Sequence, residues 1–277
     1  MKLLALALAV PALLASPLSA PADTTPADHR IPTSYESAVM GRRVLALSKL
    51  GDFSTTFPSS APPESDDAEA LSRPRDVDGL PINMMEYVAE CEDTGNPTVL
   101  AVKIGTTYRN IAAGSNVSVS LRWMPPYPPS RHIRSSLWDR LTGTIFGHSE
   151  DADAVSDTPD AVPYSAANLP RMSLIGHLEP IEPSTPEAVR LAACFVKKHP
   201  DAKYWLPGNP IHSSYWARLV VERVFWVGGF GDRAYIGWIP IEEWRSVTGE
   251  EWEAIRLPGE KEGWHEWSME APVEIDL

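Results

Sequence analysis

The feature that most constrains the fold is a set of segments in which apolar and polar residues alternate. In residues 117–123 every second residue is apolar, from Val117 to Trp123. Residues 172–178 repeat the pattern, and residues 215–227 are long, alternating and rich in β-forming residues. A period of two places one face of a strand against a core and the other face in water. The chain is therefore expected to consist mainly of antiparallel strands.

Other segments complete a mainly β chain with flanking helices, an α+β class. The 27 prolines are too many for a helical bundle and suit strands joined by long loops. Six or seven strands that are mostly linked by hairpins would close as a barrel or stack as a sandwich, and periodicity alone does not choose between them. Further strands are expected over residues 53–57, 80–90, 98–104 and 235–239, and helices over residues 37–50, 108–113, 184–198 and 241–247.

The segment between residues 91 and 97 is dense in turn-forming residues, including Asp93, Gly95 and Pro97. Two strand segments separated by such a turn usually pair with each other. The sequence therefore predicts a hairpin between strands 80–90 and 98–104.

Residues 1–20 have the pattern of a secretory signal peptide. Lys2 precedes an apolar run over residues 3–14, and small residues lead to Ala20. An uncleaved membrane anchor is the alternative, but a spanning helix needs about 18–25 apolar residues, and prolines interrupt this run. Cleavage after Ala20 or after Ala22 both fit. The mature protein is expected to be secreted or to reside in the lumen of the endomembrane system.

The remaining chain divides by composition. Residues 21–36 are polar and rich in proline, and are expected to form a flexible lead-in. One domain is expected over residues 37–247, with loop-like insertions at 58–76 and 125–170. Residues 248–277 form an acidic, Trp-rich tail with no usable period.

The charge balance excludes two classes of partner. The chain has 24 basic and 37 acidic residues, a formal net charge of −13. A chain this acidic repels nucleic acid and anionic membrane surfaces. Neither is expected as a partner.

The two cysteines, Cys91 and Cys194, leave two interpretations open. An even pair in an oxidising compartment suits one disulfide. The alternative is two separate thiols, and it is favoured because Cys91 is placed at a strand end and Cys194 inside a helix.

Asn116-Val117-Ser118 is the one N-glycosylation motif without a central proline, so Asn116 is a candidate glycan site.

Three groups of residues, in this order, resemble one family. RRVLA at 42–46, GDFST at 51–55 and GLP at 79–81 are similar to its opening helix and first strands. Residues 93–104 and 115–121 resemble its central strand and the strand after it, although Val117 stands where the family has proline. The third group resembles the family's ending and comprises LIG at 174–176, His199-Pro200, Tyr204-Trp205 and WVGGFG at 226–231.

That family is the FMN-binding split barrels related to pyridoxamine 5′-phosphate oxidase, and within them the secreted CREG-like glycoproteins. The resemblance implies a six-stranded antiparallel split barrel that works as a homodimer, with any flavin at the subunit interface. It also implies that Lys103, Thr106, Thr107 and Arg109 would hold the FMN phosphate. The alternative for Lys103 is a strand-end lysine whose stem reaches solvent, and that alternative is favoured.

No catalytic motif stands out. The seven histidines show no metal-ligand spacing, so no metal site is expected, and the glycine-rich turn at 228–231 lacks dinucleotide-binding spacing. The leading expectation is a secreted, dimeric CREG-like protein that binds an unknown protein or small-molecule ligand without catalysis and without a cofactor. The alternative is an FMN-dependent oxidoreductase, in which the flavin carries the chemistry. Haem binding is a third hypothesis, for which no axial ligand can be named.

Overall fold

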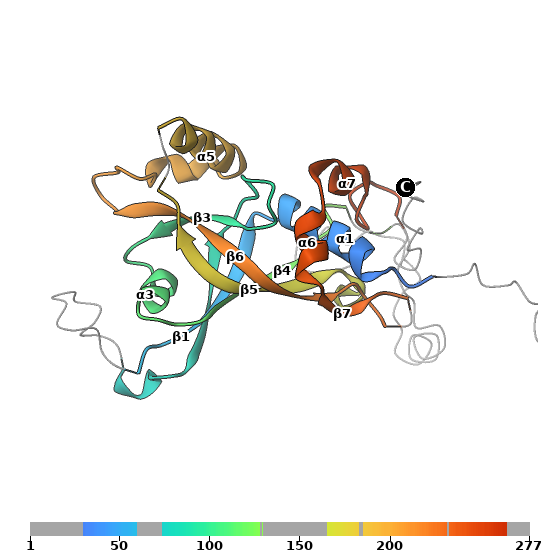
Figure 1. Ribbon diagram of the computed structural model, residues 1–277, viewed down its shortest axis with the longest axis horizontal. Helices are drawn as coiled ribbons and strands as arrows, with labels where there is room; N and C mark the ends of the chain where they lie inside the picture. Colours follow the sequence, from blue (N-terminus) through green and yellow to red (C-terminus); the bar gives the residue numbers. More distant parts are fainter. Residues whose placement is uncertain are drawn as a thin grey trace, which may run out of the picture.

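The computed structural model describes residues 30–59, 74–127, 129, 165–182, 185–231 and 233–264. Its centre is one antiparallel sheet of seven strands in the order β2-β1-β4-β5-β6-β3, with β7 paired to β6 (Figure 1). The strands are β1 (Leu50–Thr56), β2 (Pro81–Tyr87), β3 (Thr98–Val102), β4 (Val117–Arg122), β5 (Arg171–Pro180), β6 (Ser214–Val227) and β7 (Ile236–Ile239). The helices are α1 (Ser34–Leu47), α3 (Thr106–Ala112), α5 (Thr185–Lys198), α6 (Ile241–Ser246) and α7 (Gly249–Ala254), with short 3-10 turns η1 (Arg75–Val77), η2 (Ala166–Asn168) and η3 (Pro200–Tyr204).

The α+β class and the antiparallel sheet confirm the predicted fold class, with two differences. The sheet has seven strands rather than six, because β7 adds to the end of β6. It is also not closed. Between its edge strands β2 and β3, the described residues show one isolated bridge, Ala89 with Thr98.

The predicted hairpin between β2 and β3 is wrong. Strand β2 pairs with β1, with Leu50 opposite Tyr87, and β3 pairs with β6, with Thr98 opposite Arg218. The turn at 91–97 therefore carries the chain from one edge of the sheet to the other.

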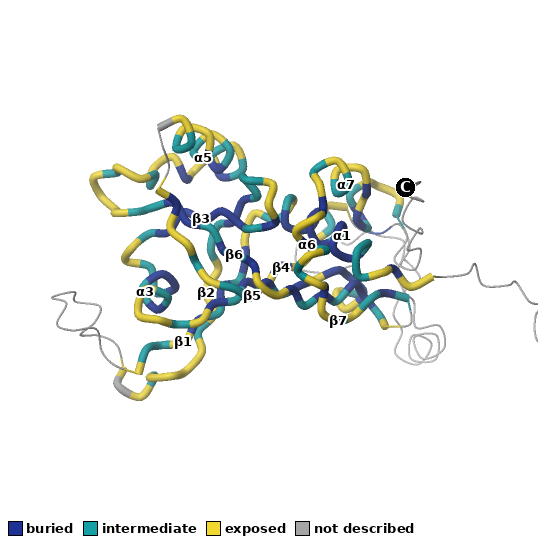
Figure 2. Tube along the Cα trace, in the orientation of Figure 1, coloured by how far each residue is buried: buried dark blue, intermediate teal, exposed yellow. Residues whose placement is uncertain are grey.

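The main core lies on the inner face of the sheet. Phe53, Val119, Leu174 and Leu219 are fully buried there. Figure 2 shows buried segments along the strands. Helix α1 covers β4, β5 and β7 and contacts α6 and α7, so these three helices gather at one end of the sheet (Figure 1). The apolar half of each alternating strand supplies this core, as its period of two requires.

Helix α1 starts three residues earlier than the sequence predicts. Thr33 caps it: its hydroxyl accepts from the Glu36 backbone N–H, while the Glu36 carboxylate accepts from the Thr33 N–H at 2.7 Å. This reciprocal capping box satisfies two backbone donors that a helix start leaves unpaired. The helix therefore begins at Ser34, inside the segment expected to be a flexible lead-in.

Helix α5 forms a second, smaller cluster against β3. Leu191 and Phe195 pack on Leu100 and Trp216, and the rings of Phe195 and Trp216 meet edge to face at 5.3 Å. A disulfide between Cys91 and Cys194 joins α5 to the 91–97 turn. The favoured interpretation of two separate thiols was wrong.

A bulge shifts the pairing of β5 with β6 between Ile175 and Gly176. A Cβ added to Gly176 would lie 1.9 Å from the Val220 carbonyl oxygen, so the close approach of the two strands requires glycine. The side-chain oxygen of Asn96 accepts from the Val221 N–H at 2.9 Å, which satisfies a donor beside the bulge.

The segment after residue 247 contains structure that its sequence pattern does not predict. Helix α7 starts at a capping box of Thr248 and Glu251. Ile255 and Leu257 are buried in the main core, and Glu260 pairs with the buried Arg43 of α1 at 2.5 Å.

Three predictions lie outside the described residues in whole or in part: the leader at 1–20, the centres of both insertions and the end of the tail. No helix among the described residues is long and apolar enough to span a bilayer.

Candidate functional site

The four residues predicted to hold an FMN phosphate lie on the turn after β3 and on the start of α3. Lys103 is exposed in the turn, because β3 ends at Val102 rather than at residue 104. This exposure fits the alternative of a lysine whose stem reaches solvent, and the role of Lys103 in FMN binding stays a prediction. Thr106 and Arg109 are half-buried, and Thr107 is buried.

Thr107 is turned towards a carboxylate rather than towards solvent. Its hydroxyl is buried without a well-formed hydrogen bond and lies beside Glu86 of β2, a residue on the inner face of the sheet. Burial raises the pKa of Glu86, while Thr107 and Tyr108 act to lower it. A phosphate needs cations and free hydroxyl or amide donors. The Thr107 hydroxyl thus lies inside the fold beside a carboxylate, and the binding of an FMN phosphate by these four residues stays a prediction.

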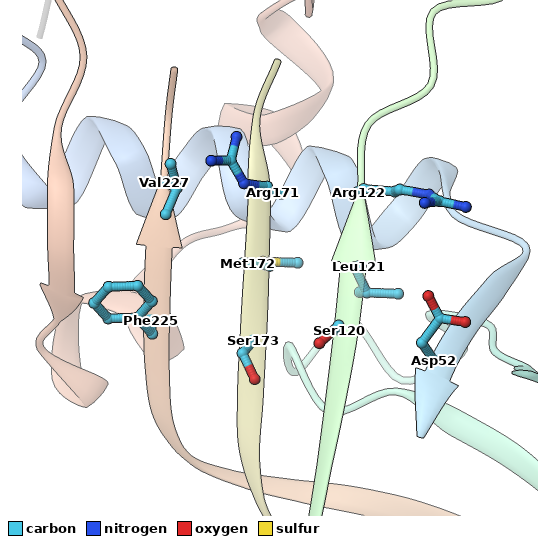
Figure 3. Close-up of a pocket in the computed structure, with 9 residues that line it drawn as sticks. All are labelled: Asp52, Ser120, Leu121, Arg122, Arg171, Met172, Ser173, Phe225 and Val227. Carbon is cyan, nitrogen blue, oxygen red and sulfur yellow. The ribbon is translucent and has the colours of Figure 1, made fainter. Parts of the chain in front are cut away.

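A hollow of about 370 Å³ lies on the other face of the sheet, and none of those four residues lines it. We call it the outer-face hollow (Figure 3). The backbone of Leu121 and Met172 forms its floor, and their buried side chains belong to the main core on the inner face. The side chains around them come from β1, β4, β5 and β6, and they are Asp52, Ser120, Arg122, Arg171, Ser173, Phe225 and Val227.

Strand register arranges these side chains in rows that cross the sheet. Residues directly opposite on neighbouring strands lie about 5 Å apart, so each row brings distant parts of the sequence together. The first row is Arg122, Arg171, Val227 and Ile236. The second row is Asp52, Ser120, Ser173, Phe225 and Trp238.

The two arginines of the first row differ in what holds them. Arg171 donates from Nη1 to the carbonyl oxygens of Ala167 and Leu169, at 3.1 and 3.3 Å. Arg122 is exposed and makes no hydrogen bond or ion pair with any described residue. Sequence reasoning missed this pair because each arginine looks like an ordinary polar residue at a strand end. The register of β4 with β5 makes them neighbours.

A third group of ionisable residues surrounds the 91–97 turn. Glu90 accepts at Oε1 from the N–H groups of Thr94 and Gly95, at 2.9 and 3.2 Å, and its Oε2 is buried without a partner. Burial raises the pKa of Glu90 to about 7, although the charge of Arg42 acts to lower it. Arg42 is itself fully buried, and it donates to the Val247 carbonyl at 3.0 Å and to Asp93 at 3.1 Å.

Two basic residues of the α5–η3 region are equally tied to the backbone. Lys198 donates to the Ala46 carbonyl at 2.7 Å, and burial lowers its pKa to about 8 while the charge of Glu90 acts to raise it. His199 donates from Nε2 to the Val88 carbonyl at 2.9 Å, and burial lowers its pKa. The His199 ring stacks on Tyr87 at 4.6 Å. These groups hold backbone segments together and lie outside the outer-face hollow.

Asn116 is exposed in the turn that precedes β4, with Ser118 two residues on in the strand. The position is accessible, and a glycan there remains a prediction. Within the part of the chain that the structure describes, no three His, Cys, Asp or Glu residues gather as metal ligands.

A family model described as CREG, beta-barrel matches residues 32–246. This range includes every strand of the sheet and helices α1 to α6. No curated protein matches the sequence significantly.

Several solved structures are similar in fold. A heme binding protein from Mycobacterium smegmatis matches at 18% identity over 80% of this chain, with a TM-score of 0.43. The protein Atu2129 of Agrobacterium tumefaciens, whose function is unknown, matches at 19% identity over 82%, also at 0.43. This chain spans 61% and 64% of those two proteins. A FAD-binding protein from Mesorhizobium loti matches at 12% identity over 66% of this chain and 87% of that one, at 0.34.

Proposed function

The chain belongs to the CREG beta-barrel family, and on that premise we propose that it is an exported, homodimeric protein that acts by binding rather than by catalysis. The observation that carries the proposal is where its perturbed ionisable groups lie. In enzymes, groups with shifted pKa values gather in clefts, because a catalytic acid, base or nucleophile needs a pKa matched to its step. Here Glu90, Lys198 and His199 are each bonded to backbone groups: Glu90 to the 91–97 turn, Lys198 to helix α1 and His199 to the residue after β2. Their arrangement suits a structural role.

The disulfide supports the export part of the proposal. Disulfides persist in oxidising compartments and are rare in the cytosol. The Cys91–Cys194 bond fits the signal peptide predicted at residues 1–20. The family resemblance supplies the expectation of a homodimer, and the Asn116-Val117-Ser118 motif in an exported chain supplies that of a glycan at the exposed Asn116.

The mass of the protein secreted from eukaryotic cells tests these assembly expectations. We expect light scattering to give twice the mass of one mature chain plus its glycan, and enzymatic deglycosylation to lower that mass. The Asn116→Gln variant is the matched control, because it should already have the lower mass and should not respond to deglycosylation. A monomeric mass would contradict the dimer, and an unchanged mass after deglycosylation would contradict the glycan.

Absorbance separates binding without catalysis from the flavin-dependent alternative. We expect the native protein to be colourless and FMN titration to leave its melting temperature unchanged, because the buried Thr107 hydroxyl lies beside the Glu86 carboxyl, an unfavourable neighbour for a phosphate. A yellow protein, or tight FMN binding, would favour the alternative oxidoreductase. A Soret band on adding haem would favour the haem hypothesis.

Should FMN bind, one variant pair shows whether the predicted residues hold it. Lys103→Gln would then weaken binding by about tenfold, since a hydrogen bond to a charged group is lost. Lys197→Gln, which removes an exposed lysine from α5, should leave binding unchanged. Equal affinities for all three proteins would place the flavin elsewhere.

A further inference from the structure

We propose that the outer-face hollow binds a small ligand that has an anionic head, either phosphate or carboxylate, on a planar aromatic body. The proposal does not depend on the absence of FMN or on dimerisation. It rests on the charges, hydroxyl groups and rings that strand register brings together there (Figure 3).

The first step is the charge of the hollow. Arg122 and Arg171 occupy directly opposed positions on β4 and β5, and like charges in that arrangement destabilise a sheet unless an anion is present. The one carboxylate in the lining is Asp52, and it forms no ion pair with either arginine. The hollow therefore has two cations and one anion, in a chain whose overall charge is −13.

The second step is the set of donors. Arginine binds carboxylate and phosphate through two parallel N–H groups. Arg171 is held by backbone carbonyls and presents a fixed charge, whereas Arg122 has no partner among the described residues and can turn towards a ligand. The Ser120 and Ser173 hydroxyls lie opposite each other one row further along and can donate to the same anion.

The third step is the apolar wall. Phe225 borders the hollow, and its ring meets Trp238 of β7 edge to face at 5.1 Å. Val227 continues this wall beside Arg171. A planar ring would lie over the floor and against Phe225, with its anionic head at the arginines. The volume of about 370 Å³ is near the lower end of the range for small-ligand sites.

Asp52 narrows the ligand class. It stands opposite Ser120 at the edge of the hollow, diagonal to Arg122. A carboxylate there repels a second negative charge and accepts a hydrogen bond. The favoured ligand therefore has one anionic group and, at its other side, a hydroxyl or N–H donor.

Calorimetric titration of the full secreted protein tests the proposal, with phenyl phosphate and benzoate as separate probes for the two kinds of head. Inorganic phosphate and phenol are the matched half-probes. We expect at least one aromatic anion to bind, and to bind more tightly than either half alone. Weak, equal heats for all four compounds would overturn the proposal.

Variants locate the bound probe. We expect Arg122→Gln to weaken binding about tenfold or more, because it removes a charged donor that no described residue uses. Arg223→Gln is the matched control: Arg223 is exposed on the same face of β6, opposite Ile175 and outside the lining. Asp52→Asn should strengthen binding of a dianionic head.

An equal loss of probe affinity in Arg122→Gln and Arg223→Gln, or no loss of affinity in either, would overturn the proposal. So would a fall in oligomeric mass in Arg122→Gln without probe binding in the wild type, since a second copy would then fill the hollow.

Discussion

Removing the disulfide by Cys91→Ala and Cys194→Ala together should lower the free energy of unfolding by about 4 kcal/mol. The bond closes a loop with a sequence separation of 103, and the entropy that such a loop removes from the unfolded chain corresponds to about 4–5 kcal/mol. In a domain of this size that loss lowers the melting temperature by roughly 10 °C. The disulfide also stabilises the fold locally, because it holds α5 and its Phe195 against β3.

Thermal melts with and without reductant check this prediction. The wild type should melt lower once reduced, and the double variant should melt at that lower temperature under both conditions. The double variant is thus its own control for effects of the reductant. Equal melting temperatures for oxidised and reduced wild type would contradict the prediction, as would two free thiols in the unreduced, unfolded protein.

The second large effect is a gain of stability on mild acidification. The pKa of Glu90 is raised from 4.5 to about 7 in the folded protein. A carboxyl with a raised pKa binds its proton more tightly when folded. The stabilisation that this proton gives the folded state is therefore fully present below about pH 4.5 and is lost as the pH rises through 7. When the pH is lowered from 7.5 to 5, protonation of Glu90 should raise the free energy of unfolding by about 2 kcal/mol.

Glu86, whose pKa burial also raises, acts in the same sense as Glu90. Other groups act in the opposite sense. Burial lowers the pKa of His199, so the unfolded chain takes up that proton first and stability falls as the pH drops through 6.5. Glu251 and Glu260 have lowered pKa values, so the stability that their charged forms give the folded protein is lost only below about pH 4.5. Lys198, with a pKa of about 8, changes stability at higher pH, between about 8 and 10.5.

Comparing the wild type with Glu90→Gln isolates the Glu90 contribution. Glutamine keeps an oxygen to accept from Thr94 and Gly95 and has no proton to bind. We expect chemical denaturation to show that the free energy of unfolding of the variant, relative to that of the wild type, is higher at pH 7.5 than at pH 5. If both proteins shift in parallel, Glu90 is not the responsible group.

Sequence patterns predicted the elements well and their pairing poorly. The alternation from Val117 to Trp123 located β4, because a strand with one wet face must place every second residue in the core. The turn at 91–97 has residues that suit a hairpin, yet its flanking strands pair with β1 and β6. Turn chemistry describes the local backbone, whereas partner choice depends on the whole sheet.

The same limit applies to the sites. Lys103, Thr106, Thr107 and Arg109 are close in sequence, so a motif could nominate them, but only the structure places Glu86 beside Thr107. Arg122 and Arg171 lie in different strands with an insertion between them, and no local pattern connects them. Cys91 and Cys194 gave contrasting local signals because one precedes a turn and the other lies in a helix, although the fold brings them together.

The disulfide also determines how the molecule responds to proteases. Cys91 and Cys194 close a covalent ring that includes β3, α3, β4 and β5. A single cut anywhere within that ring leaves both fragments attached to each other. A nicked molecule would therefore migrate as one intact chain on a gel without reductant and as two fragments with it. Cleavage in this part of the protein can pass unnoticed until the disulfide is broken.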